Sequence, residues 1–451
     1  MKSKKRVWQN VSPMKLILSG YCFIIVLGTL LLALPFSTRG QGTTTVSDCF
    51  FTATSATCVT GLIRVDTATN WTVFGQLVIL GLIQIGGVGF MTIAIMIMVF
   101  TKRKITLRQR SVMQNSVSAP QLGGIVRMTR FILLGTLAVE GVGALLLSFD
   151  FVPRFGVKKG IYYSIFHSIS AFCNAGFDLM GTETGPFTSL TGMYDNWYVN
   201  IVIMLLIVLG GLGFFVWLDL IQKRFRFQKL SLQSKMVLSI SVMLIVGGAV
   251  ALFALEYNQP LLEGVSIKER ILVCLFQSVT ARTAGFNTID LSAMTEGSKL
   301  LMICLMLIGG SPGSTAGGMK TTTIWVLCIS IVATFKRKKN IEVFGRRMEE
   351  GITRTSSCVF MIYLLTVLLS TILVSSIEGI PVISALFETG SAMATVGASF
   401  GVTPTLRMFS KLLITVLMIC GRVGSITMLM AFSSDKGVTS SSYALEKVQV
   451  G

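Results

Sequence analysis

Residues 51–61 read Phe-Thr-Ala-Thr-Ser-Ala-Thr-Cys-Val-Thr-Gly, a short stretch rich in hydroxyl side chains that closes on a glycine. Three later stretches repeat this order of Phe, hydroxyl residues, Ala and Gly, at 166–176, 276–285 and 387–397, and the third is one residue shorter. The closing residues are Gly61, Gly176, Gly285 and Gly397, which lie 115, 109 and 112 residues apart. Self-similarity at so regular a spacing predicts four copies of one structural unit.

A glycine-rich turn inside an apolar segment follows each stretch. The four turns read Gly86-Gly-Val-Gly89, Gly210-Gly-Leu-Gly213, Gly309-Gly-Ser-Pro-Gly313 and Gly421-Arg-Val-Gly424. Glycine in a membrane helix allows neighbouring backbones to pack closely. Each unit therefore reads as an outer apolar helix, a short pore stretch and an inner apolar helix, followed by a basic loop.

The predicted fold class is all-α integral membrane, with four tandem helix–pore-loop–helix repeats and about eight transmembrane helices around a pseudo-four-fold pore. The repeats are expected at 1–117, 118–230, 231–345 and 346–451. The outer helices are predicted near 15–36, 125–151, 233–256 and 354–376, and the pore stretches near 46–61, 160–176, 268–285 and 382–397. The inner helices are predicted near 72–100, 197–220, 298–334 and 409–432.

Composition agrees with a membrane protein. Hydrophobic residues make up 52% of the 451 residues and charged residues only 13%, against about 25% in a soluble domain. The net charge of +19 is concentrated in short basic clusters at 2–6, 102–110, 223–229 and 336–339, each just outside an apolar segment. This pattern is typical of cytoplasmic loops and argues against a nucleic-acid partner. The nine cysteines form no CxxC pair, which excludes a disulfide framework or a zinc site of the usual spacing.

The four glycine-terminated stretches are too short and too polar to span lipid, so we expect re-entrant segments that line a water-filled path. Carbonyl oxygens before each glycine would replace the water shell of a dehydrated cation, and glycine permits the backbone angle that this requires. The predicted filter residues are Val59, Thr60, Gly61, Asn174, Ala175, Gly176, Thr283, Ala284, Gly285, Thr395, Val396 and Gly397. The alternative is four re-entrant loops that simply pack.

The motifs resemble those of the Trk/Ktr/HKT superfamily of potassium transporters, and the resemblance covers nearly the whole chain. It rests on Thr57-Cys-Val-Thr-Gly-Leu62, Cys173-Asn-Ala-Gly-Phe177, Thr280-Ala-Arg-Thr-Ala-Gly-Phe-Asn287, Ala394-Thr-Val-Gly397 and the segment 309–320. The chain is most similar to the membrane subunit of the bacterial Ktr branch. The resemblance implies one filter glycine per repeat and potassium as the transported ion, because plant relatives that favour sodium have serine where this chain has Gly61. A sodium-preferring or sodium-coupled transporter of the same fold is the alternative.

The same resemblance implies partners and a location. These are a homodimer of pore subunits in the cytoplasmic membrane, in contact with lipid, and a cytoplasmic ring of regulatory subunits that bind ATP, ADP or NAD-type ligands. This chain itself has no nucleotide motif and no cofactor is expected in it, with K⁺ as cargo and Na⁺ as a candidate coupling ion. The basic loops and both termini are predicted to be cytoplasmic. On the sequence the tail 433–451 is either dimer-forming or disordered, and the resemblance implies that it lies at the dimer interface.

The segment 309–320 interrupts the third inner helix with residues that form helices poorly. Polar, irregular backbone at membrane depth indicates a loop in the water-filled path, and the resemblance makes it a gate beneath the filter. A kinked helix is the alternative. The predicted gate residues are Gly309, Gly310, Ser311, Pro312, Gly313, Ser314, Thr315, Ala316, Gly317, Gly318, Lys320 and Arg422.

Several charged or titratable residues lie within apolar segments. Arg422 in the fourth inner helix is expected to meet carbonyls or hydroxyls of the loop, since a charge in the membrane is a functional hypothesis by default. Arg282 is expected to brace the third filter stretch, with Glu388 as one candidate partner. His167 is interpreted as a packing or hydrogen-bonding group rather than a pH sensor, and Lys320 either ends the broken helix or takes part in gating.

Two other function classes remain open on the sequence. A membrane enzyme would need clustered carboxylates, histidines or a nucleophile with its base, and one histidine with an isolated Glu140 does not supply them. A non-conducting sensor is disfavoured by four intact filter glycines, and a measurement of ion flux would separate it from a transporter.

Overall fold

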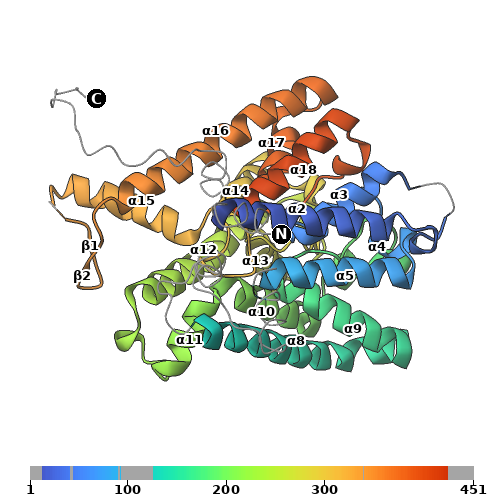
Figure 1. Ribbon diagram of the computed structural model, residues 1–451, viewed down its shortest axis with the longest axis horizontal. Coiled ribbons are helices and arrows are strands. Elements are labelled where there is room, and N and C mark those ends of the chain that lie inside the picture. Colours follow the sequence, from blue (N-terminus) through green and yellow to red (C-terminus); the bar gives the residue numbers. More distant parts are fainter. Residues whose placement is uncertain (1–12, 41–43, 90–91, 93–124, 339, 425–451) are drawn as a thin grey trace, which may run out of the picture.

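The computed structural model describes residues 13–40, 44–89, 92, 125–338 and 340–424, and Figure 1 shows them as one bundle of helices that lie side by side. The first two groups of helices are α2 (Pro13–Leu32), α3 (Val46–Thr57), α4 (Thr67–Asn70) and α5 (Val73–Val88), then α8 (Ile125–Phe155), α9 (Val157–Phe172), α10 (Trp197–Leu212) and α11 (Phe214–Gln222). The third and fourth are α12 (Leu232–Glu256), α13 (Ile267–Thr280), α14 (Glu296–Leu307) and α15 (Thr321–Phe335), then α16 (Ile352–Glu378), α17 (Val382–Ala394) and α18 (Met408–Val423).

The remaining elements are short. They are the 3₁₀ turns η1 (Pro35–Ser37), η2 (Met180–Thr182), η3 (Thr191–Met193), η4 (Phe227–Lys229), η5 (Pro260–Leu262), η6 (Leu291–Ala293) and η7 (Thr403–Thr405), and the strands β1 (Glu342–Val343) and β2 (Arg346–Arg347). The strands form an antiparallel hairpin that pairs Glu342 with Arg347 and Val343 with Arg346. The hairpin and α15 extend together from one end of the bundle (Figure 1).

Four described helices, α2, α8, α12 and α16, are long and apolar enough to cross a membrane. They coincide with the four predicted outer helices. The first ends at Leu32 rather than near residue 36, because Pro35 starts the turn η1. The other apolar helices are shorter or broken, so the eight spans expected from the sequence appear here as four long helices and a set of shorter pieces.

The second inner helix was predicted as one span over 197–220, and this is wrong. The chain breaks at Gly213, where α10 and α11 meet at 91°. Gly213 has φ +94°, which side-chain-bearing residues rarely adopt, and the next amide, Phe214 N–H, donates to Gly313 O at 2.9 Å. The helix ends here because the Phe214 amide donates to the loop carbonyl of Gly313 and not to a carbonyl of its own helix, although the sequence stays apolar after Gly213.

The helices α5 and α18 also end at glycines with positive φ, Gly89 and Gly424, with φ of +88° and +93°. The predicted continuations to residues 100 and 432 lie outside the described residues, as do the basic clusters at 2–6 and 102–110 and the tail 433–451.

Close backbone packing sets the positions of three inner helices. A Cβ on Gly86, Gly210 or Gly421 would stand 2.1, 1.9 or 2.1 Å from a backbone oxygen at the end of a pore stretch. Those oxygens belong to Thr57, Phe172 and Met393. The glycine-rich turns therefore allow the inner helices to approach the pore stretches to a distance that no side chain would permit.

The helix contacts close on themselves around the bundle. The inner helix of each group packs against the pore helix of the next, in the pairs α5 with α9, α10 with α13, α14 with α17 and α18 with α3. This cyclic order brings the ends of α3, α9, α13 and α17 toward one centre.

Replacing Gly86 with alanine tests this packing. Because the new methyl group would collide with Thr57 O, we expect Gly86→Ala to lose about 1–3 kcal/mol of stability, seen as a lower melting temperature of the detergent-solubilised protein. Gly81→Ala, in the same helix with nothing within 4 Å of the added Cβ, is the matched control and should melt at or above the native temperature. Equal melting temperatures for the two variants would contradict the packing argument.

Candidate functional site

The pore helices α3, α9, α13 and α17 end just before the four glycines that close the repeated stretches. The carbonyl end of a helix carries a partial negative charge. The backbone then turns through a residue with positive φ, two positions before each glycine. These residues are Val59, Asn174, Thr283 and Thr395, with φ of 56°, 58°, 71° and 53°. Positive φ is uncommon and costly outside glycine, so its recurrence at four matched positions indicates a functional requirement.

The four glycines form a closed ring. Each packs against the carbonyl oxygen of the residue that precedes the next glycine around the ring. An added Cβ would lie 2.3 Å from Ala175 O at Gly61, 2.5 Å from Ala284 O at Gly176, 2.3 Å from Val396 O at Gly285 and 2.1 Å from Thr60 O at Gly397. The structure thus brings together the residues that the sequence analysis assigned to a filter, including the shorter third stretch.

Buried hydroxyl groups hold the ring segments from behind. Ser55 and Ser391 accept hydrogen bonds from the amides of Gly61 and Gly397, each at 3.1 Å. At the matching positions of the other two stretches, Ser170 Oγ donates to Phe177 O and Thr280 Oγ1 donates to Phe286 O, both at 2.7 Å. These four hydroxyl residues of the repeated motif therefore have a structural role, because each ties the turn to its own helix.

A cavity of about 330 Å³ adjoins the ring on one side, and all four glycines line it. The residues two positions after each glycine also line it, and they are Ile63, Asp178, Asn287 and Ser399. The sequence analysis did not assign these residues. Their equal offset from the four glycines was the signal that could have found them.

On the other side of the ring lies the irregular segment between α14 and α15. It is not helical, so the kinked-helix alternative is wrong for residues 308–320. Its amides at Ser311 and Thr315 donate to Gly211 O and Gly210 O, at 3.0 and 3.2 Å. The segment thus fills the break in the second inner helix.

The same loop contacts the inner ends of two pore stretches. Thr315 Oγ1 donates to Phe172 O at 3.1 Å and lies 3.2 Å from the side-chain amide of Asn174. A Cβ on Gly317 would stand 2.1 Å from Thr395 Oγ1. The loop therefore sits directly against the ring segments.

Two basic side chains hold backbone oxygens around this loop. The Arg422 guanidinium donates to Thr315 O in the loop and to Gly86 O and Gly87 O of α5, the last at 3.1 Å. Lys320 Nζ donates to Ala316 O at 2.9 Å and Gly317 O at 3.4 Å, while its backbone precedes α15. Neither takes part in an ion pair within the described chain. The expected contact between Arg422 and loop carbonyls is thus observed.

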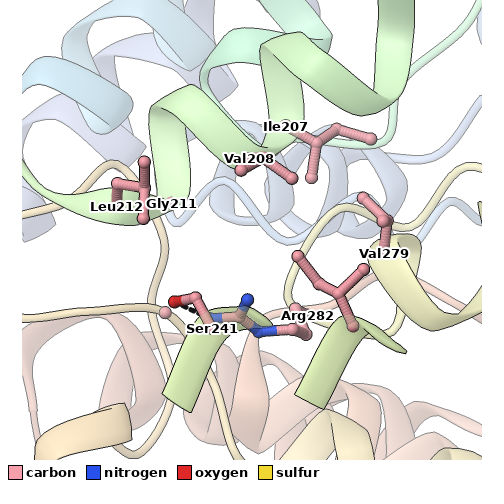
Figure 2. A pocket seen from close by; sticks show the side chains of 9 residues that line it. Ile207, Val208, Gly211, Leu212, Ser241, Val279 and Arg282 are labelled. Atoms are coloured by element: carbon pink, nitrogen blue, oxygen red, sulfur yellow. Dashed lines mark hydrogen bonds between the residues drawn. The ribbon is translucent and has the colours of Figure 1, made fainter. Parts of the chain in front are cut away.

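Arg282 does not meet Glu388, and that candidate pairing is wrong. Its Nη2 donates to Ser241 Oγ at 3.2 Å beside a void of about 10 Å³ that α10 borders, whereas its Nε has no partner (Figure 2). Glu388 instead accepts from Ser399 Oγ and Thr403 Oγ1, each at 2.6 Å. Sequence could not decide this because both residues lie in pore stretches whose relative rotation depends on packing.

His167 is fully buried in α9, as a packing and hydrogen-bonding residue would be. Its Nδ1 lies 2.8 Å from Tyr163 O, and its Nε2 accepts from Leu179 N–H at 3.3 Å. The neutral ring thus ties α9 to the chain that follows Gly176.

Comparisons with known proteins agree with this arrangement. Residues 23–440 match the TrkH family, described as a cation transport protein. The chain is 39% identical to the potassium/sodium uptake protein NtpJ of Enterococcus hirae, over 99% of each chain. It is also 39% identical to the Ktr system potassium uptake protein B of Bacillus subtilis, over 96% of this chain and 95% of the relative.

A solved structure, the potassium transporter TrkH from Vibrio parahaemolyticus, has the same fold. The TM-score is 0.71 at 18% sequence identity, over 92% of this chain and 85% of that one. The cyclic arrangement of helices and the matches along almost the whole sequence lead to one conclusion: the chain belongs to the TrkH family of cation transport proteins, within the superfamily that its repeated motifs predicted.

Proposed function

We propose that this protein takes up potassium ions across the cytoplasmic membrane, through the ring of Gly61, Gly176, Gly285 and Gly397. The main support for this proposal is the closed ring of glycine–carbonyl contacts, because this ring lies between the cavity on one side and the loop of residues 308–320 on the other. Carbonyl oxygens of the residues before the glycines would replace the water around the ion. Relatives named as potassium uptake proteins support this cargo, and a family of transport proteins favours it over an enzyme.

Sodium is the second candidate cargo or coupling ion. The relative from Enterococcus hirae is named for both potassium and sodium. Glycine at all four filter positions favours potassium under the superfamily resemblance, since serine at the first position accompanies sodium preference in plant relatives.

The loop of residues 308–320 is the proposed gate. Its backbone oxygens are held by Arg422 and Lys320, so the closed loop is fastened by two cations that would also repel a potassium ion. Opening would require Arg422 to release Thr315 O. Because Arg422 belongs to α18 and also donates to Gly86 O of α5, the loop is coupled to both helices.

The names of the relatives support control by partner proteins. Several are named as proteins of a Ktr system, which supports a regulatory partner. We propose that this partner is a cytoplasmic nucleotide-binding ring and that two pore subunits form a homodimer.

The four-repeat division at residues 117, 230 and 345 fits the cyclic helix contacts. The basic clusters after α11 and α15 lie at the same end of the bundle (Figure 1), which favours that end as cytoplasmic.

Gly61→Ser tests the filter. Because its Cβ would collide with Ala175 O, we expect a host without its own uptake systems to need about tenfold more potassium for growth, or to gain sodium flux. Gly156→Ser has a similar backbone strain, with φ +80°, but nothing within 4 Å of the added Cβ, and should grow like the native chain. Growth of the Gly61 variant at native potassium concentrations, with equal amounts inserted, would exclude the ring as the filter.

Arg422→Gln tests the gate. The shorter neutral side chain loses the carbonyl contacts, so we expect potassium flux without the regulatory partner to rise by about tenfold. The measurement is rubidium uptake into proteoliposomes. Arg407→Gln, an exposed position at the start of the same helix, should leave the flux unchanged. A stable Arg422 variant whose flux equals the native value would show that this side chain does not hold the gate.

A further inference from the structure

The third pore stretch is packed differently from the other three. In the first, second and fourth groups, a glycine of the inner helix stands against a backbone oxygen at the end of the pore helix. The glycine at the matching position of the third group is Gly309, and a Cβ there would instead meet Gly317 O of its own loop, at 2.6 Å. None of the described glycines therefore holds the end of the third stretch in this way.

The residue just before the positive-φ position also differs in the third stretch. It is Cys58, Cys173 and Ala394 in the first, second and fourth stretches, and all three side chains are small and fully buried. In the third stretch it is Arg282, next to Thr283 with φ of 71°. A strained backbone angle persists only where its surroundings hold it. A large basic side chain thus stands where the packing by an inner-helix glycine is missing.

Arg282 is only 8% exposed, and none of the ion pairs among the described residues includes it. Its Nη2 donates to Ser241 Oγ, and its Nε has no hydrogen-bond partner. Figure 2 shows a further guanidinium nitrogen that points away from Ser241, toward Ile207 and Val208 of α10. A guanidinium has five N–H donors, and buried donors without an acceptor are costly. The side chain therefore requires an acceptor on the side that faces α10.

The void on that side has the size and the polar groups for one water molecule. It is lined by Arg282 and Ser241, by Gly211 near the end of α10 and by Gly310 of the loop. Gly211 O and Gly310 O each accept one backbone hydrogen bond, and a carbonyl oxygen can accept two. A volume of about 10 Å³ matches one water-sized probe, and a buried water needs two to four polar partners. A larger acceptor such as chloride does not fit.

We propose that Arg282 and Ser241 bind one buried water molecule in this void, and that the water ties the third pore stretch to the end of α10 and to the loop of residues 308–320. Arg282 is then a positioning residue, which does for the third stretch what the inner-helix glycines do for the others. This role rests on the proposed function, since it concerns the same filter and gate. When the loop moves, Gly310 moves with it, so the filter geometry of the third stretch depends on the position of the gate.

Ion selectivity of full-length variants in proteoliposomes tests this role, as the ratio of initial rubidium uptake to initial sodium uptake. Arg282→Met keeps a long side chain but removes every donor, and we expect the ratio to fall by about threefold to tenfold. Arg282→Lys should recover most of the loss, because its ammonium group can donate to both Ser241 and the water. Lys268→Gln removes an exposed charge from the same pore helix and should behave as native.

Ser241→Ala removes one partner of the water and leaves the guanidinium in place. We expect a smaller loss in the same direction, and no further loss when it is combined with Arg282→Met, because both changes act on one site. An unchanged ratio in Arg282→Met, or in Ser241→Ala if the methionine variant does not fold, would overturn the proposal. Additive losses, or equal losses in the lysine and methionine variants, would also overturn it.

An experimental map at a resolution that shows ordered water completes the design. We expect density in the native void within about 2.7–3.2 Å of a guanidinium nitrogen, and a native map without it would exclude the site. If the water is present and Arg282→Met lowers the melting temperature, but the native protein takes up no potassium, the proposed function fails and the water site stands. If the native protein transports potassium and Arg282→Met keeps its selectivity, the positioning role fails and the function stands.

Discussion

The rest of the structure depends on glycine backbones that approach carbonyl oxygens more closely than any side chain allows. Gly86, Gly210 and Gly421 let three inner helices pack onto the ends of pore stretches. This packing draws the four pore stretches together, so that a second set of glycines can close into a ring on their neighbours' carbonyls. Both sets act through the absence of a Cβ, which is why glycine recurs at equal offsets along a chain whose repeats differ in most other residues.

Backbone oxygen is also the partner of the buried cations. Arg422 and Lys320 neutralise no carboxylate in the described chain and instead gather carbonyl groups of the loop and of α5. A cation held by carbonyls can be released without leaving a bare negative charge in the membrane, as the proposed gate would require. On the far side of the ring Asp178 lines the cavity, and none of the ion pairs among the described residues includes it.

Hydropathy predicted the long helices well and their interruptions poorly. The outer helices α2, α8, α12 and α16 fall within a few residues of the predicted spans, because burial in lipid demands a long apolar run. The break at Gly213 was missed, since the residues on both sides remain apolar and the bend exists only where Gly313 accepts the Phe214 amide. The partner of Arg282 was missed for a similar reason: Ser241 lies on another helix, and no spacing along the chain relates the two.

The sequence by itself determined the class of the protein, the long outer helices, the recurring glycines and the interruption between α14 and α15, since each leaves a local mark in composition or spacing. Only the tertiary structure decided which carbonyl each glycine meets, how Arg422 reaches both the loop and α5, and that Asp178 and Asn287 line one cavity. These contacts join residues from different units, and their geometry follows from the rotation and depth of packed helices, which leave no periodic signal in the chain.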